Sequence, residues 1–293
     1  MSSSAEGPTD LEKYLFDVQG FILLRGAISP AELAAMNACI DEIPPMVPGE
    51  WYGYVHAHQF GGKNGVNLQQ IYEAGEPFEK MIDHPAYFEK VRTFVGGEDT
   101  FDYSYGSMFI DENFVSLRGP SEGIFPHSGG YGCSKRTQYQ IRNQKFLCGQ
   151  VNVLTALTDV AEGDGQTVVV PGSHKANFPH PDVESARRLD NETNADAITG
   201  AIRVTMYAGD VLIFVDGICH GAEPRLNSGQ RRICVYRYGA SWGNFRHGYQ
   251  VSPELLARLS PERRKIVRPL DPLPRDPQVP ARSPAAASNG ARA

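Results

Sequence analysis

Two histidines and an arginine have the types and order needed to hold a reactive metal and an acidic cosubstrate. His127 is followed far downstream by His220, and Arg231 comes eleven positions after His220. Non-haem Fe(II) is usually held by two histidines and one carboxylate, which leaves coordination positions open for a cosubstrate and O₂. The carboxylate normally lies two positions after the first histidine. In this chain that position is Gly129, which has no side chain to offer.

The glycine at position 129 allows three interpretations. Two neutral ligands leave Fe(II) with its full charge, so an open position attracts a small anion such as chloride, and we favour this interpretation. A carboxylate from elsewhere, namely Glu122, Asp164 or Asp216, could instead replace the missing ligand and support hydroxylation. In the third interpretation, Gly129 and Gly130 only form a turn, and the protein is a non-catalytic barrel that binds a ligand.

Arg231 is the candidate for binding the distal carboxylate of 2-oxoglutarate, because its planar guanidinium pairs bidentately with carboxylates. Its neighbour Arg232 should face the opposite side of a strand, so only one of the two can serve, and a surface arginine is the alternative interpretation for either. The spacing from His220 favours Arg231. Asn152 and Thr155 lie in a predicted strand and are candidates to complete the cosubstrate pocket.

Two segments are candidates for substrate binding. Residues 131–145 contain four basic side chains and no acidic one, which suits an anionic group such as a nucleotide phosphate; a solvated loop is the alternative. The basic residues are Lys135, Arg136, Arg142 and Lys145. The aromatic segment 51–60, with Tyr54 and His56, could stack on a flat base or could pack into the core.

Composition limits the class of protein. The chain has 293 residues, of which 41% are hydrophobic and 21% charged, as in globular proteins. The net charge of −6 argues against a general nucleic-acid binder. Five scattered cysteines without a CxxC motif indicate reduced thiols and a cytoplasmic protein. Neither a signal peptide nor an apolar run of membrane-spanning length is visible.

The chain is expected to form one folded domain, residues 9–270, between two disordered ends. Residues 1–8 are small and polar, and residues 271–293 are rich in proline and alanine. The predicted domain consists of a helical layer at 9–100, a barrel at 101–240 and C-terminal helices at 250–267.

Local patterns predict the elements of this domain. Residues 20–26 form an apolar run typical of a buried strand. Ser29-Pro30-Ala31-Glu32 has the pattern of a capping box and predicts a helix to about residue 43, with a second helix at 78–95. Ala208-Gly209-Asp210 is predicted to be a hairpin turn, and His174 is expected to fix a turn by hydrogen bonding. Further helices are predicted from Ser252 and Ser260. Strands are predicted at 101–110, 148–157, 166–170, 202–206, 211–215 and 231–238, which favours an antiparallel sandwich or barrel.

Several of these segments, taken in order, resemble the phytanoyl-CoA dioxygenase-like branch of the Fe(II)/2-oxoglutarate enzymes. The similar segments are 17–26, 157–175 with its Pro171-Gly172-Ser173-His174-Lys175 turn, 208–210, and His220-Gly221 with Arg231. Together they cover about residues 14–240. The resemblance implies a mainly β fold with flanking helices: a double-stranded β-helix, or jelly-roll-like barrel, with the metal in its mouth.

The chain departs from this resemblance at Gly129, where hydroxylases of the family have a carboxylate. Family members with Gly or Ala at that position include iron-dependent halogenases, and the chain is most similar to those that act on nucleotides. The resemblance therefore implies His127 and His220 as iron ligands, and Fe(II), 2-oxoglutarate, chloride and O₂ as cofactors. It implies chlorination of an unactivated sp³ carbon of a small, nucleotide-like molecule, with no polymeric nucleic acid or membrane as partner.

Overall fold

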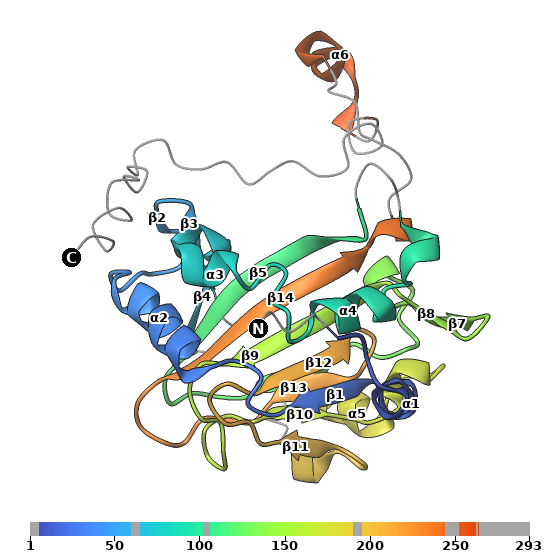
Figure 1. Ribbon diagram of the computed structural model, residues 1–293, viewed down its shortest axis with the longest axis horizontal. Helices are drawn as coiled ribbons and strands as arrows, with labels where there is room; N and C mark the ends of the chain where they lie inside the picture. Colours follow the sequence, from blue (N-terminus) through green and yellow to red (C-terminus); the bar gives the residue numbers. More distant parts are fainter. Residues whose placement is uncertain are drawn as a thin grey trace.

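An eight-stranded antiparallel sheet dominates the computed structural model, which describes residues 6–59, 65–101, 106–189, 195–243, 252–261 and 263. Its central strands run side by side across the molecule (Figure 1). The order is β1 (Phe21–Leu24), β12 (Val211–Val215), β9 (Gln150–Ala156), β14 (Arg231–Ala240), β5 (Met108–Arg118), β4 (Gly65–Gln69), β3 (Val55–Gln59) and β2 (Trp51–Tyr52).

A second sheet of four strands completes the barrel. Its order is β11 (Ile202–Val204), β10 (Thr167–Val169), β13 (His220–Ala222) and β6 (Ile124–His127). The chain passes repeatedly between the two sheets, because β12 of the large sheet lies in sequence between β11 and β13 of the small one. This arrangement confirms the predicted jelly-roll-like fold. A separate hairpin consists of β7 (Tyr139–Arg142) and β8 (Lys145–Cys148).

Helices cover one face of the large sheet and leave the other face for the cavity described below. The helices of this layer are α1 (Asp10–Gln19), α2 (Pro30–Asp41), α3 (Glu76–Glu79) and α4 (Phe88–Phe94). Tyr236 of β14 points into the layer and donates a hydrogen bond to the carbonyl of Phe78 over 2.6 Å. Phe16 of α1 stacks on Phe94 of α4 with ring centroids 3.7 Å apart. Alternation along β14 places the next residue, Arg237, on the opposite face.

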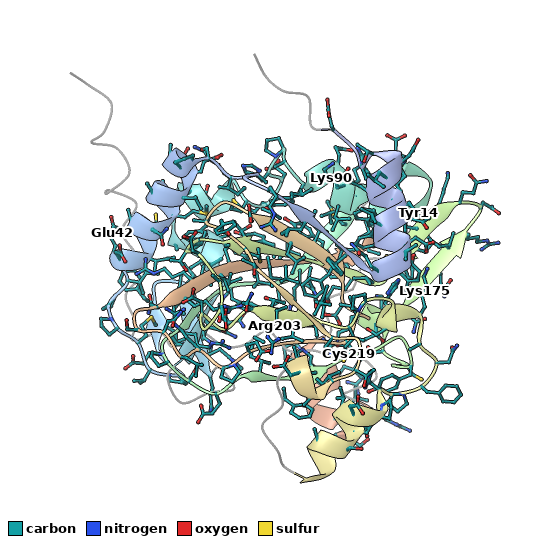
Figure 2. The ribbon with its side chains drawn as sticks, turned by 90° about the horizontal axis from the view of Figure 1, so that it is seen from below. Tyr14, Glu42, Lys90, Lys175, Arg203 and Cys219 are labelled. Carbon is teal, nitrogen blue, oxygen red and sulfur yellow. The ribbon has the colours of Figure 1, made fainter. Side chains whose placement is uncertain are left out.

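Capping residues set the beginning of both long helices in this layer. Ser29 and Glu32 form the predicted capping box, and α2 ends at Asp41, close to the predicted end. Thr9 and Glu12 form a second capping box at α1, which the sequence did not single out. Glu12 also forms an ion pair with Lys90 at 2.7 Å, and Figure 2 shows Lys90 beside α1. The capping carboxylate thus joins α1 to α4.

The N-terminal part of the predicted architecture needs two corrections. The predicted helix 78–95 is divided into α3 and α4, because Pro85 between them lacks an amide hydrogen and disfavours helix at the preceding residue. Residues 51–59 and 65–69 were assigned to a helical layer but contain β2, β3 and β4, which extend the large sheet beyond β5.

The strand predictions also need correction. The strand predicted at 101–110 is β5, which begins at Met108 and runs to Arg118; its charged residues obscured it in the sequence. Short strands β6, β7, β8 and β13 were not predicted from local pattern. The turn at 208–210 joins β11 to β12, which lie in different sheets, so it is not a hairpin. Asp210 holds this turn by accepting hydrogen bonds from the amides of Gly26 and Tyr207, at 2.8 and 2.9 Å.

The remaining elements are short or peripheral. They are η1 (Ile71–Ala74), η2 (Glu98–Thr100), η3 (Lys135–Thr137), η4 (Ser173–Lys175), α5 (Pro181–Leu189), η5 (Ala195–Ala197), η6 (Ser241–Gly243) and α6 (Pro253–Arg258). Helix α6 confirms the helix predicted from Ser252. The helix predicted from Ser260 falls largely outside the described residues, as do residues 271–293 and most of 1–8. Within the described ranges, no helix has both the length and the apolar character to cross a membrane.

His174 links the barrel to α1. Its Nε2 lies 3.1 Å from the carbonyl of Asp17, so this nitrogen carries the hydrogen and donates. Its buried Nδ1 has no hydrogen-bond partner within the described residues. The ring packs so closely on Gly20 that a Cβ there would lie 2.6 Å from Nδ1. The histidine fixes its turn by hydrogen bonding, as the sequence suggested.

This environment predicts a pH dependence of stability. Burial lowers the pKa of His174 to about 4 from 6.5. Between these values the unfolded chain binds the proton and the folded protein does not, so stability is lost as pH falls through this window. His174→Gln should reduce the change in unfolding free energy between pH 6.5 and 4 by about 3 kcal/mol. Urea unfolding at a series of pH values measures it.

His58→Gln is the matched control, because His58 is exposed. That variant should keep the pH dependence of the natural protein. Equal pH dependence in His174→Gln and the natural protein would contradict the assignment, since all other buried histidines are present in both.

Candidate metal and cosubstrate site

His127 and His220 lie directly opposite each other on neighbouring strands of the small sheet. The register of β6 and β13 pairs the two residues, and their ring centroids are 4.3 Å apart with planes tilted by 52°. Both rings line the same cavity between the sheets. Two residues far apart in the sequence are thus brought to one point by strand pairing.

Backbone hydrogen bonds set the tautomer of both rings. The Nδ1 of His127 lies 3.0 Å from the carbonyl of Phe125, and the Nδ1 of His220 lies 2.8 Å from the carbonyl of Ile218. A carbonyl can only accept, so each Nδ1 carries the hydrogen, and each Nε2 keeps a lone pair. Metal-binding histidines are commonly oriented in this way. The donor set therefore fits a divalent metal held by two Nε2 atoms.

Burial keeps this pair neutral. It lowers the pKa of His220 well below 6.5, and the neighbouring His127, Arg237 and Arg136 lower it further. Burial also lowers the pKa of His127, although the carbonyl of Phe125 and the charge of Asp216 act in the opposite direction. A neutral imidazole is the form that binds metal, so the pair is prepared for a metal ion at neutral pH.

Glycines allow the two strands to approach closely enough to pair the histidines. A Cβ on Gly221 would lie 2.4 Å from the carbonyl oxygen of Ile124, and a Cβ on Gly123 would lie 2.5 Å from that of Ala222. Both contacts involve backbone, which has little freedom to move away. The pairing geometry of the histidines therefore depends on these glycines.

Gly129 begins a turn directly after β6, and its carbonyl accepts a hydrogen bond from the amide of Gly132. Its φ is 142°, and a Cβ there would lie 2.5 Å from the ring of Tyr131, which is not part of the cavity wall. The next residue, Gly130, donates its amide hydrogen to the carbonyl of Ser173 over 2.9 Å. Gly129 and Gly130 therefore do form a turn, and position 129 supplies no ligand.

The three proposed replacement carboxylates are held elsewhere. Asp164 is paired with Arg225 at 3.1 Å, and Glu122 does not line the cavity. Asp216 is buried; its Oδ1 accepts from Asn152, and its Oδ2 lies 3.2 Å from Arg136. Across the described ranges, no group of three His, Cys, Asp or Glu side chains is arranged to hold a metal.

The cavity has a volume of about 230 Å³ and contains the histidine pair. Its wall consists of Gln59, Asn67, Phe114, Ser116, Ile124, His127, Asn152, Leu154, Thr167, Phe214, His220, Gly221, Ala222, Arg231, Ile233, Val235 and Arg237. Of the two residues proposed on the strand β9, Asn152 lines it. Thr155 does not line the cavity, because strand alternation turns it to the opposite face from Asn152 and Leu154. The structure therefore does not place Thr155 in the cosubstrate pocket, contrary to the expectation from the sequence.

Arg231 is buried in the cavity wall beside two other arginines. Its Cα partner across the strand pair is Arg118, whose Nη2 donates to the carbonyl of Glu223 over 2.6 Å. Burial, together with the charges of Arg118 and Arg225, lowers the pKa of Arg231 to about 9. Its buried Nε–H has no hydrogen-bond partner within the described residues. Concentrated positive charge with an unused donor fits the carboxylate of a dicarboxylic cosubstrate.

Sequence reasoning missed Arg118 because its strand was predicted too early in the chain. A signal was nevertheless present in Gly163-Asp164-Gly165. A Cβ on Gly165, where φ is 76°, would lie 1.7 Å from the Nη2 of Arg118. This glycine makes room for the buried guanidinium.

Arg232 faces away from the cavity, as strand alternation requires. Its Nη1 donates to Asn37 over 3.0 Å, and its Nη2 pairs with Asp41 over 2.7 Å. Arg232 therefore fastens β14 to helix α2 and provides a natural control for Arg231.

The basic segment does not contribute to the cavity wall. Lys135 is exposed, and Arg136 points instead to Asp216. Arg142 and Lys145 face each other across the exposed β7–β8 hairpin. Proximity to His127 in the sequence does not bring these residues into the cavity.

The two aromatic candidates also lie outside it. Tyr54 is exposed in the turn between β2 and β3, and His56 packs on Trp51 with ring centroids 4.4 Å apart. The wall instead contains Arg237, which the sequence did not single out.

Comparisons with known proteins agree with this geometry. The sequence model of the phytanoyl-CoA dioxygenase (PhyH) family matches residues 16–233, well over half of the chain. The chain is 22% identical over 209 residues to the dioxygenase cdmD of Talaromyces verruculosus, covering 70% of this chain and 62% of that protein. The chain thus spans less than two thirds of that relative.

Solved structures share the fold. HygX from Streptomyces hygroscopicus, with nickel and 2-oxoglutarate bound, superimposes with a TM-score of 0.67 at 22% identity, covering 80% of this chain and 88% of HygX. The carbocyclase SnoK from nogalamycin biosynthesis superimposes with a TM-score of 0.54 at 17% identity, covering 88% and 94%. At these identities the likeness concerns the fold alone.

Removing either histidine should prevent Fe(II) binding. His127→Ala and His220→Ala should each weaken anaerobic Fe(II) binding by more than about 100-fold, since losing only an outer-shell partner costs about 10–100-fold. Equilibrium dialysis measures the affinity, and His180→Ala, outside the cavity wall, is the control. Unchanged affinity in either test variant would contradict the two-histidine site.

Arg231 and Arg232 should differ sharply in their effect on cosubstrate binding. Arg231→Gln should weaken 2-oxoglutarate binding about 10–100-fold, because it removes a charged hydrogen-bond donor. Arg232→Gln should leave binding unchanged, because Arg232 faces α2. Calorimetric titration measures both, and equal losses would refute the assignment.

Proposed function

The chain belongs to the phytanoyl-CoA dioxygenase family, a branch of the Fe(II)/2-oxoglutarate oxygenases, and we propose that within this family it is a halogenase. It would use Fe(II), 2-oxoglutarate and O₂ to replace a hydrogen on an sp³ carbon of a small molecule by chlorine. One observation carries the proposal. Within the described residues, two neutral imidazoles face the cavity, and no carboxylate lies in place to complete a triad.

The overall reaction balances without a further reductant. One R–H, chloride, 2-oxoglutarate, O₂ and a proton give R–Cl, succinate, CO₂ and water. O₂ takes two electrons from the decarboxylation of 2-oxoglutarate and two from the substrate carbon. Iron, when bound, supplies the site at which O₂ is activated.

The chain's residues would bind and orient the reactants. His127 and His220 provide two Nε2 donors, and Arg231 would pair with the distal carboxylate of 2-oxoglutarate. The structures of HygX with iron, and with nickel and 2-oxoglutarate, support this assignment by analogy of fold. Leu154 and Ile233 provide apolar surface in the cavity wall.

The local charge favours a halide in the vacant position. The ionised side chains of the cavity wall are Arg231 and Arg237; Asp and Glu are absent from this wall as far as the structure describes the chain. Arg136, outside the wall, also acts electrostatically on the histidine pair. Glu112 and Asp216 offset the charges of Arg237 and Arg136, so the buried Arg231 supplies the net positive charge of the wall. In a low-dielectric cavity this charge attracts small anions.

Hydroxylation is the alternative, and Asp216 is the observation that favours it. The buried Oδ2 of Asp216 forms an ion pair with the half-exposed Arg136 at 3.2 Å but accepts no hydrogen bond within the described residues. Rotation of this carboxylate toward His127 would supply the third ligand and exclude the halide. The relative cdmD is named a dioxygenase, and SnoK a carbocyclase, so several outcomes occur on this fold.

A nucleotide as substrate remains a prediction from the sequence. The four basic residues that suggested a phosphate site do not line the cavity. A non-catalytic barrel is disfavoured by the buried arginine and the oriented histidines, which ligand binding alone does not require.

Substitution of Gly129 tests the halogenase proposal. Gly129→Asp should abolish chlorination, because a carboxylate would compete for the vacant position. Gly129→Ala is the matched control; it shares the backbone strain, about 1–3 kcal/mol, and the contact with Tyr131, but adds no ligand. It should still chlorinate in a chloride-dependent reaction. Mass spectrometry of reactions with and without chloride detects the products.

Two results would count against the proposal. Chlorination by Gly129→Asp would exclude the vacant-site explanation. An oxygenated product from the natural protein, formed equally without chloride and lost in Asp216→Asn together with Fe(II) binding, would establish the hydroxylase alternative.

A further inference from the structure

Arg237 is a second arginine in the cavity wall, distinct from the arginine assigned to the cosubstrate. It lies on β14, where its Cα partners are Glu112 on one side and Asn152 on the other. Asn152 also pairs with Phe214 of β12, whose ring lies 4.8 Å from that of His220. Arg237 therefore belongs to the row of the sheet nearest the histidine pair.

Two neighbours hold the guanidinium of Arg237 in place. Its Nη1 pairs with the Oε2 of Glu112 at 2.6 Å, and the guanidinium lies 5.4 Å from the ring centroid of Phe114. Glu112 is itself fixed, because its Oε1 accepts a hydrogen bond from Gln69 over 2.7 Å. A rigid arginine loses little conformational entropy when it binds a ligand.

The ion pair with Glu112 leaves part of the guanidinium unused. An arginine has five N–H donors in a planar fork, and Glu112 engages one edge. The buried Nε–H of Arg237 has no hydrogen-bond partner within the described residues. A buried donor without a partner is unfavourable, so the cavity is better satisfied when it contains an acceptor.

Arg231 and Arg237 define separate anion positions. They are six residues apart on one strand, which corresponds to about 20 Å between their Cα atoms. The two side chains also have different neighbours, because Arg231 lies opposite Arg118 and Arg237 pairs with Glu112. The unused donor of Arg237 is therefore available to an anion other than the one assigned to Arg231.

We propose that Arg237 binds an anionic group of the substrate, a carboxylate or a phosphate, so that the protein acts on small organic acids or phosphate esters. The substrate assignment rests on the proposed oxidation at the histidine pair. Asn67 and Ser116 in the same wall provide neutral hydrogen-bonding groups, and Phe114 and Val235 provide apolar contact for the rest of the molecule.

Anion binding to the metal-free protein tests this proposal independently of any reaction. Inorganic phosphate and acetate, titrated calorimetrically, serve as probes for the two possible groups. Arg237→Gln should weaken binding of at least one probe about tenfold or more, because a charged hydrogen bond is lost. Arg142→Gln, on the exposed hairpin, should bind both probes like the natural protein.

Glu112→Gln separates a binding role from a purely structural ion pair. Removing this carboxylate frees the whole fork, so the variant should bind the favoured probe more tightly than the natural protein. The double variant Glu112→Gln/Arg237→Gln avoids an unpaired carboxylate and should bind as weakly as Arg237→Gln. A larger effect on phosphate indicates a phosphate ester, and a larger effect on acetate indicates a carboxylic acid.

The proposal is overturned if the natural protein binds neither probe, or if Arg237→Gln and the double variant bind both probes unchanged. Because metal and cosubstrate are absent from these titrations, failure of the halogenase proposal would not alter their outcome. Conversely, chlorination of a neutral substrate with unchanged KM in Arg237→Gln would refute the substrate assignment alone.

Discussion

The direct pairing of His127 with His220 across two short strands is the constraint on which the site depends. The strands approach so closely that Gly123 and Gly221 have no room for a Cβ. Backbone carbonyls two residues before each histidine then fix its ring and tautomer. The positions of the two histidines thus depend on the sheet. They do not depend on Gly129, which lies in the flanking turn and supplies no ligand.

Positive charge is the second organising feature of the cavity. Burying a guanidinium without a partner is costly, yet Arg231 keeps an unused buried donor and Arg237 keeps another. Anionic reactants would offset this cost, and each arginine lies where a different anion would bind. In this account the protein combines a cosubstrate carboxylate, a halide at the metal and an anionic substrate in one small cavity.

Local signals in the sequence predicted the parts of the fold that depend on local interactions. The capping box at Ser29 and the apolar strand β12 were found because neighbouring residues determine them. Strand β5 was predicted too early because the acidic Glu112 is unfavourable in a strand when the sequence is considered locally. Its partner Arg237 lies on the neighbouring strand β14, which is distant in the sequence. The histidine pair and Arg231 were identifiable from an ordered family pattern, whereas Arg118 and Arg237 enter the site through strand register.

The basic segment after His127 illustrates the same limit, because the β7–β8 hairpin carries Arg142 and Lys145 to the surface and Arg136 pairs with Asp216. The central claim is that the metal is held by two histidines with a halide in place of a carboxylate. A crystal structure of the anaerobic complex with Fe(II), 2-oxoglutarate and bromide tests it most directly, since bromide is located by its anomalous scattering. The account predicts bromide on the metal beside the Nε2 atoms of His127 and His220. A metal ligated by Asp216, without bromide, would contradict it.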